Sequence, residues 1–167
     1  VITNVSKGTA PSTFFGGTQN FATLVAEPIL VSKNPVNGTL KVIPITNLTL
    51  TFDQNMQIGN GNVLIKRVSD DSLVETIDVT SGNITINNAI VQINPTIDLP
   101  QKTALYVIVP VGAFEDLTTR SWTGLVNKTD WTFTTDDTTD PIVTTLSPID
   151  NTINVAPSDN LTVTFSK

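Results

Sequence analysis

One segment of this chain occurs twice, and the two copies align without a gap. The first copy spans residues 27–54 and the second spans residues 140–167. Eleven positions are identical between the copies, and most of the others carry side chains of similar chemistry. The distance from one copy to the next is about one domain length. Such a repeat indicates separate folded units in a row, because solenoid repeats have much shorter periods.

The repeat divides the chain into three parts. We expect one complete unit at residues 27–139 and the first strands of the next unit at residues 140–167. Residues 1–26 form an N-terminal segment, for which the end of a preceding unit is one interpretation. The chain starts at Val1 and stops directly after a strand-like sequence, so we expect it to be a fragment of a longer protein.

The second copy of the repeat ends in an apolar alternation that an isolated strand would expose to water. Such a strand would be prone to aggregate. We therefore expect its apolar side chains to be buried, either against residues 1–26 or by strand exchange with a neighbouring molecule. These side chains are Leu161, Val163 and Phe165.

Alternation of apolar and polar residues with a period of two runs through the complete unit, and helical periodicity is nearly absent. In the sequence LTLTFD at residues 48–53, for example, Leu48, Leu50 and Phe52 alternate with polar residues. Such alternation predicts a strand with one buried face. Turn residues separate seven to nine such strands, which indicates an all-β fold and an antiparallel β-sandwich.

The composition excludes several classes of protein. The chain has no cysteine and no histidine, which rules out disulfides, thiol chemistry and histidine-based catalysis or zinc binding. The net charge is −6 and Lys66-Arg67 is the only adjacent basic pair, so no nucleic-acid partner is expected. No apolar run reaches the length of about 20 residues that a membrane-spanning helix requires, so we expect no membrane span in this fragment.

Six segments of the complete unit, taken in order, resemble bacterial Ig-like domains of the S-layer type. They correspond to the opening strands, the first hairpin and the closing strands of that family. One departure is the sequence Thr118-Thr119-Arg120, where the family often has Gly-Asn soon after the Asp. The segments are residues 34–38 (NPVNG), 48–52 (LTLTF), 59–65 (GNGNVLI), 106–109 (YVIV), 112–116 (GAFED) and 131–135 (WTFTT).

The resemblance implies tandem Ig-like antiparallel β-sandwiches in an extracellular or cell-surface bacterial protein. Domains of this kind serve as spacers in S-layer proteins, adhesins and secreted multi-domain enzymes, and carry no active site of their own. We therefore expect a non-catalytic structural spacer or stalk module. Its expected partners are the neighbouring Ig-like units of the same protein.

Carboxylates are the only plausible catalytic groups, and their placement does not favour an enzyme. Asp70-Asp71 and Asp136-Asp137 lie in turn or linker sequence, where Asp bonds to nearby backbone groups. A glycosidase needs two carboxylates that face each other across a cleft, and this chain has only three Glu. A deep pocket lined by converging carboxylates would instead indicate an enzyme.

A calcium ion at the linker is the one metal site that the sequence suggests. Asp136, Asp137 and Asp140 lie where two units meet, and calcium binds six to eight oxygen ligands. The spacing of a calcium loop is missing, so a plain acidic linker with no cofactor is the alternative. We expect Asp116 to cap its own loop through backbone N–H groups rather than to bind a metal.

Aromatic residues offer a second hypothesis for the function. Trp131 and Phe133 are two positions apart on a predicted strand, so both are expected in the core. Trp122 lies in the irregular loop 112–128 and is the candidate for an exposed ligand-binding ring. The chain would then be a surface module that binds a carbohydrate or a surface protein through this loop.

Overall fold

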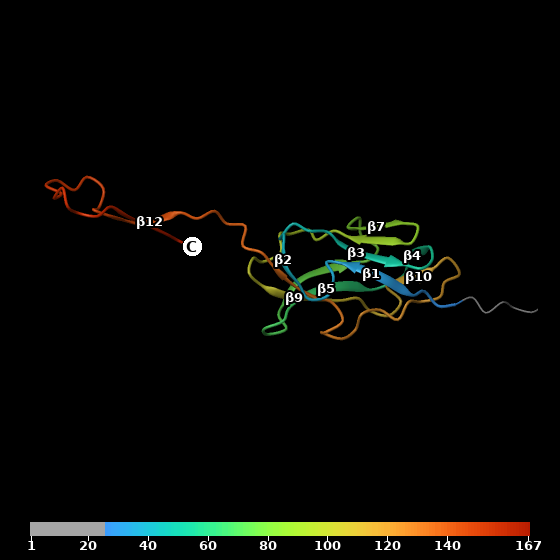
Figure 1. Cartoon of the computed structure of the whole chain (residues 1–167). Coiled ribbons are helices and arrows are strands. Elements are labelled where there is room, and N and C mark those ends of the chain that lie inside the picture. Colours follow the sequence, from blue (N-terminus) through green and yellow to red (C-terminus); the bar gives the residue numbers. More distant parts are fainter. Residues whose placement is uncertain (1–25) are drawn as a thin grey trace, which may run out of the picture.

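The computed structural model describes residues 26–167, which form a β-sandwich, a short linker and a separate two-stranded hairpin (Figure 1). The prediction of an all-β fold with an Ig-like antiparallel sandwich is confirmed, because the regular structure of the described part consists of strands. The interpretation of residues 1–26 as the end of a preceding unit falls on residues 1–25, which lie outside the described part.

One sheet of the sandwich has four strands in the order β1-β3-β8-β7, and all neighbours in it are antiparallel. In β3 the side chains of Leu48, Leu50 and Phe52 are buried, as the alternation in the sequence predicts. The strands are β1 (Leu30–Asn34), β3 (Leu48–Phe52), β7 (Ile84–Asn87) and β8 (Ile90–Ile93).

The facing sheet has five strands in the order β2-β11-β9-β5-β6. Its first pair, β2 with β11, is parallel, and the other pairs are antiparallel. Strand β1 is at the edge of one sheet and β2 at the edge of the other, so the chain changes sheets between them. The strands are β2 (Thr39–Val42), β5 (Asn62–Arg67), β6 (Leu73–Asp78), β9 (Ala104–Ile108) and β11 (Thr132–Thr135).

The segment expected to be an irregular loop between β9 and β11 is partly paired. Strand β10 (Phe114–Asp116) pairs with β4 (Met56–Ile58) as a small two-stranded sheet. Two isolated bridges fold the rest of the segment back on itself: Val109 pairs with Leu125, and Glu115 pairs with Ser121. This pairing restricts the directions of the side chains between β10 and Leu125.

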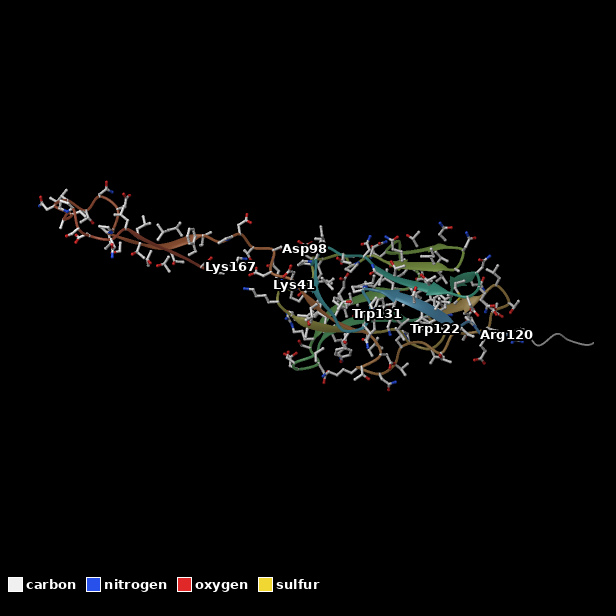
Figure 2. The ribbon with its side chains drawn as sticks, viewed as in Figure 1. Lys41, Asp98, Arg120, Trp122, Trp131 and Lys167 are labelled. Carbon is white, nitrogen blue, oxygen red and sulfur yellow. The ribbon has the colours of Figure 1, made fainter. Side chains whose placement is uncertain are left out.

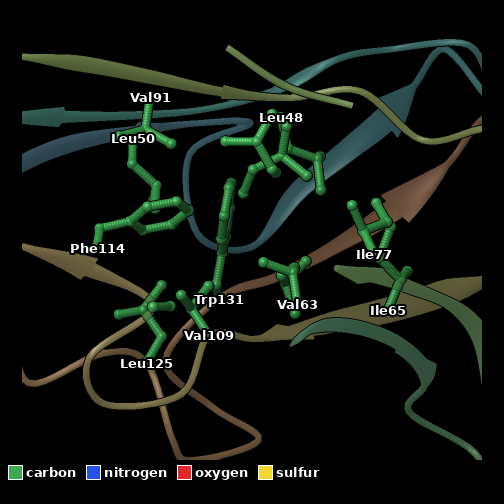
Figure 3. Close-up of a cluster of buried hydrophobic side chains, with 14 of the residues drawn as sticks. Leu48, Leu50, Val63, Ile65, Ile77, Val91, Val109, Phe114, Leu125 and Trp131 are labelled. Carbon is green, nitrogen blue, oxygen red and sulfur yellow. The ribbon is translucent and has the colours of Figure 1, made fainter. Parts of the chain in front are cut away.

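The core lies between the two sheets, and Trp131 is at its centre (Figure 3). Trp131 and Phe133 are both fully buried, which confirms their predicted place in the core. Burial of one large apolar side chain contributes about 1.5–3 kcal/mol to folding. Other fully buried members include Leu48 and Leu50 from one sheet and Val63 from the other, so the cluster joins both layers.

The hairpin consists of β12 (Val143–Ser147) and β13 (Thr162–Phe165), which pair antiparallel. It follows the linker and projects away from the sandwich (Figure 1). A long loop, residues 148–161, joins the two strands.

Candidate functional site

The chain enters the sandwich at one end and leaves it at the opposite end (Figure 1). Lys41 and Asp98 mark the end from which the linker leaves, and Arg120 marks the opposite end (Figure 2). The end with the linker is the candidate functional site, because any neighbouring unit connected through the linker must meet this surface first.

The early part of the sandwich is tied to its last strand. The backbone N–H of Gly38 donates to the carbonyl of Thr132 at 2.7 Å, and the N–H of Thr132 donates to Oδ1 of Asn37 at 2.7 Å. Asp136 N–H donates to the carbonyl of Val42 at 2.8 Å. Gly38 has a positive φ of 79°, a conformation that glycine adopts without steric strain.

The indole of Trp131 adds a further link between these parts of the unit. Its Nε1–H donates to the carbonyl of Pro35 at 2.7 Å inside the protein. Pro35 lies between β1 and β2, so this hydrogen bond links the sheet switch to the last strand. A buried carbonyl needs such a partner, because an unpaired polar group in the interior is destabilising.

The linker after β11 is held by side-chain contacts on both sides. Asp137 accepts an ion pair from Nζ of Lys102 at 2.6 Å and another from Nζ of Lys167 at 2.8 Å. Lys102 belongs to the sandwich, whereas Lys167 follows β13, so one carboxylate bridges the sandwich and the hairpin. These two lysines, followed by the Thr139 hydroxyl, hold the pKa of Asp137 far below its usual value.

The backbone of the linker is bound as well. Oε1 of Gln101 accepts hydrogen bonds from the Thr138 N–H at 3.1 Å and from the Thr139 hydroxyl at 3.0 Å. The linker therefore lies against the loop that precedes β9 rather than leaving the sandwich freely.

The linker carboxylates do not assemble the expected calcium site. Within residues 26–167, no group of three or more His, Cys, Asp or Glu side chains is placed to hold a metal ion. Asp136 accepts the N–H of Asp137 at 2.9 Å, Asp137 is neutralised by two lysines, and Asp140 is exposed. Ammonium groups therefore occupy the position that a cation at Asp137 would need.

Trp122 is buried, so the expectation of an exposed ring is wrong. It is 4% exposed, and it packs edge-on against Phe52 with the ring centroids 5.0 Å apart. Figure 2 shows Trp122 inside the sandwich. The Trp122 N–H donates to the Phe114 carbonyl at 3.0 Å, and this pairing directs the indole into the core. The sequence could not show it, because residues 117–124 have no strand alternation.

Asp116 caps its loop, as predicted. Its Oδ1 accepts hydrogen bonds from the Thr118 N–H, the Thr118 hydroxyl and the Arg120 N–H, at 2.7, 2.7 and 2.9 Å. Burial opposes ionisation, but the hydrogen bonds from Arg120 and Thr118 outweigh it and lower the pKa of Asp116. Thr119 takes a positive φ of 65° at the place where the sequence departs from the family pattern.

The two neighbouring carboxylates of the β5–β6 turn, Asp70 and Asp71, have different partners. Asp70 accepts from the Ser72 N–H and hydroxyl, as the turn interpretation predicts. Asp71 instead accepts from the Tyr106 hydroxyl at 3.0 Å and pairs with Nζ of Lys128 at 2.8 Å. These partners, Lys128 first, lower the pKa of Asp71.

Tyr106 therefore forms a cluster on the outer face of the five-stranded sheet that sequence reasoning missed. Nζ of Lys128 and Nζ of Lys66 lie 5.4 and 5.8 Å from its ring centroid. A shallow hollow of about 410 Å³ beside the cluster is lined by Lys66, Asp71 and Lys128 as well as by Tyr106. Tyr106 is 4% exposed, so its ring stabilises the lysines by cation–π attraction and offers no open face to a sugar. No sequence spacing indicates a contact between residues so far apart along the chain.

The hairpin repeats the pairing of β1 with β3. Leu30 stands opposite Phe52 in the sandwich, and Val143 stands opposite Phe165 in the hairpin. The three other pairs also correspond, and both strand pairs carry an irregularity after the first pair. The two copies of the repeat thus share this strand pair, whereas residues 152–155, at the positions of β2, form no strand.

The two copies differ in what covers them. Phe52 is 3% exposed, whereas Phe165 is 54% exposed and Leu161 is 82% exposed. The prediction that Leu161, Val163 and Phe165 are buried is therefore wrong for a single chain. Two strands supply only one side of a sandwich, and within residues 26–167 no sheet faces the hairpin to cover its apolar side chains. Strand exchange with a neighbouring molecule stays a prediction.

Comparison with known proteins agrees with this architecture. The part of the chain that the structure describes contains no helix that is both long and apolar enough to cross a membrane. A comparison with curated proteins found no match to the sequence. The family model described as a bacterial Ig-like domain matches residues 25–135, which include all the strands of the sandwich. Domains of this family are typically non-catalytic surface or structural modules and occur in bacterial surface or secreted proteins. The chain belongs to the bacterial Ig-like domain family.

Proposed function

We propose that the chain is a non-catalytic spacer or stalk module of a secreted or cell-surface bacterial protein of the S-layer or adhesin type. In this role the module transmits tension along the stalk and keeps a terminal element away from the surface. The observation that carries the proposal is the parallel pairing of β2 with β11, which joins the early part of the sandwich to its exit strand.

Tension along the chain acts on this strand pair in the direction in which the pair resists separation. Force that reaches β2 from the N-terminal side, through β1, pulls β2 and β11 in opposite directions along their length, because the strands are parallel. All hydrogen bonds of the pair then bear the load together, whereas pulling at one end of a hairpin breaks the bonds one after another. The Trp131–Pro35 and Thr132–Asn37 hydrogen bonds lie in the same region and add to this resistance.

The hairpin supports an arrangement in series. We propose that residues 27–139 form one complete unit and that residues 140–167 are the opening strands of a second. The neighbouring units of the same protein would then be its partners. The bridge from Lys102 through Asp137 to Lys167 supports this, because it restricts the angle between successive units.

Single-molecule pulling of the full chain from both termini tests the proposal. We expect one high-force unfolding event from the sandwich, and a lower unfolding force for Asn37→Ala, which removes the acceptor for Thr132. Asn62→Ala is the matched control, since Asn62 is exposed on β5, away from the β2–β11 pair, and should leave the force unchanged. Forced unfolding reports the unfolding rate, so both variants should also be compared by chemical denaturation.

An equal force for wild type and Asn37→Ala would count against the tension-bearing role. A binding module acting through loop 112–128 is not the better proposal, because its expected anchor, Trp122, is packed against Phe52.

A further inference from the structure

Two Asn-Gly dipeptides occur in this chain, and their surroundings in the fold differ. They are Asn37-Gly38, in the turn before β2, and Asn60-Gly61, in the connection between β4 and β5. In such a dipeptide the backbone nitrogen of the glycine can attack the side-chain amide carbon of the asparagine, because glycine has no Cβ to obstruct the approach. Both dipeptides are therefore chemically prone to lose the side-chain amide, a reaction known as deamidation.

Hydrogen bonds hold every group that would have to react at Asn37. Its Oδ1 accepts from the N–H and the hydroxyl of Thr132, at 2.7 and 3.1 Å, and its Nδ2 donates to the Thr129 carbonyl at 3.3 Å. The attacking nitrogen, that of Gly38, donates its N–H to the Thr132 carbonyl at 2.7 Å. These contacts accompany the pairing of β2 with β11, so reaction at Asn37 requires this part of the sandwich to open first.

The corresponding groups at Asn60 are not engaged. Asn60 is exposed, and in the described part of the chain neither its side-chain amide nor the N–H of Gly61 makes a hydrogen bond. The backbone on either side is held, because the Asn60 N–H donates to the Gly112 carbonyl at 2.9 Å and the Gly61 carbonyl accepts from the Val79 N–H at 3.0 Å. The fold therefore fixes the ends of this connection and leaves the reacting groups accessible to each other and to water.

We propose that Asn60 is a site of spontaneous deamidation in the folded protein and that the fold protects Asn37 from the same reaction. The Gly61 nitrogen loses its proton and bonds to Cγ of Asn60, and the side-chain amide leaves as ammonia, which takes up that proton. The product is a five-membered succinimide ring, which one water molecule opens at either of its two carbonyl carbons. Opening leaves aspartate or isoaspartate at position 60, and the reaction consumes water alone.

The modification changes a part of the backbone that has little room to move. Isoaspartate inserts one additional methylene into the main chain directly before Gly61. Gly61 has a φ of 122°, which favours glycine, and a Cβ added there would lie 2.9 Å from Cγ of Pro110. We therefore expect the isoaspartate form to unfold at a lower temperature, because the inserted methylene displaces the carbonyl that pairs with Val79.

Peptide mapping of the full chain by mass spectrometry, after incubation at mildly alkaline pH, tests the proposal. Trypsin separates the two sites, because cleavage after Lys33, Lys41 and Lys66 gives one peptide of residues 34–41 and another of residues 42–66. We expect Asn60 to be converted at least about tenfold faster than Asn37, whose reaction depends on local opening. In H₂¹⁸O the modified position should carry the label, because the new carboxyl oxygen comes from water.

Two controls show whether the fold causes the difference. In urea, above the unfolding transition, the rates at Asn37 and Asn60 should become similar, because neither dipeptide is then held by other segments. Asn60→Gln, at an exposed position, should remove the reaction at this site, since ring closure from the longer side chain would need a six-membered ring. The same substitution should leave the slow reaction at Asn37 unchanged.

Two results would overturn the proposal. Equal rates at Asn37 and Asn60 in the folded chain would mean that the contacts with Thr132 give no protection. Conversion of Asn60 in urea but not in the folded chain would mean that the backbone around Gly61 prevents ring closure.

Discussion

Phe52 and Phe165 occupy the same position in two strand pairs of identical register, yet Phe52 is 3% exposed and Phe165 is 54% exposed. The local sequences LTLTF and LTVTF are nearly the same. The difference lies in what faces them: Phe52 contacts Trp122 from a segment much later in the chain, whereas no segment of the described part of the chain covers Phe165. Local structure here is set by the repeat, and burial is set by distant parts of the chain.

Trp131→Phe should lower the free energy of unfolding by about 1–3 kcal/mol, because it leaves the buried Pro35 carbonyl without its donor. Urea denaturation followed by circular dichroism measures the change. Tyr106→Phe is the comparison: it also removes one hydrogen bond, but its acceptor, Asp71, is exposed to water, so its effect should be smaller. Equal effects of the two substitutions would contradict this account of the Trp131 hydrogen bond.

Trp122→Ala should destabilise the sandwich by about 3–5 kcal/mol, as is usual for removal of a buried aromatic side chain. Leu117→Ala lies in the same loop but at an exposed position, so it should change stability by no more than about 0.5 kcal/mol. Thermal or urea unfolding separates the two outcomes. A Trp122→Ala protein of unchanged stability would mean that the ring does not pack in the core.

Stability should be nearly constant around neutral pH and fall in acid. The chain has no histidine, and the pKa values of Asp71 and Asp116 are lowered in the folded state. A lowered folded-state pKa stabilises the protein above the unfolded pKa, near 3.9, and this contribution is lost as the pH falls through the folded pKa. Melting temperatures measured between pH 7 and pH 2 should therefore decrease only below about pH 4.

Asp116→Asn should flatten part of this acid dependence, because the amide keeps an oxygen acceptor but has no charge to titrate. Asp98→Asn, at an exposed position at the other end of the sandwich, serves as the control. If the melting curves of wild type and Asp116→Asn keep the same pH dependence, Asp116 is not a source of the acid sensitivity.

High salt or Asp137→Asn should loosen the hairpin relative to the sandwich. Both treatments weaken the ion pairs from Lys102 and Lys167, and screening is strong at about 0.5 M salt, where the Debye length is only a few ångströms. Backbone ¹⁵N relaxation should show faster motion of β12 and β13, with the melting temperature of the sandwich little changed. Asp140→Asn is the control and should leave the relaxation rates unaltered. If Asp137→Asn also leaves the rates unchanged, the ion pairs at Asp137 do not restrain the hairpin.

Much of the sandwich could be predicted from the sequence, because strand alternation is a local property. The alternation at residues 48–52 placed Leu48, Leu50 and Phe52 on one buried face, and the spacing of Trp131 and Phe133 placed both in the core. The capping role of Asp116 was also predictable, since its hydrogen bonds reach only as far as Arg120.

The candidate site was less accessible to such reasoning, because its contacts join residues far apart in the chain. The sequence predicts Asp71 to be a turn residue, but the fold places Tyr106 and Lys128 beside it. Asp137 read as a possible metal ligand, but two lysines from distant parts of the sequence converge on it. Trp122 had no pattern of its own, and only the pairing of β10 turned it inward.

The sequence alone determined the all-β class, the alternating faces of strands such as Leu48–Phe52 and the repetition of one segment a domain length later. These features follow from side-chain chemistry at short range, where the period of the backbone decides which residues share a face. Only the tertiary structure decided which apolar faces are covered and which charges meet. Burial and ion pairing depend on segments brought together across the whole chain, and no local pattern encodes that proximity.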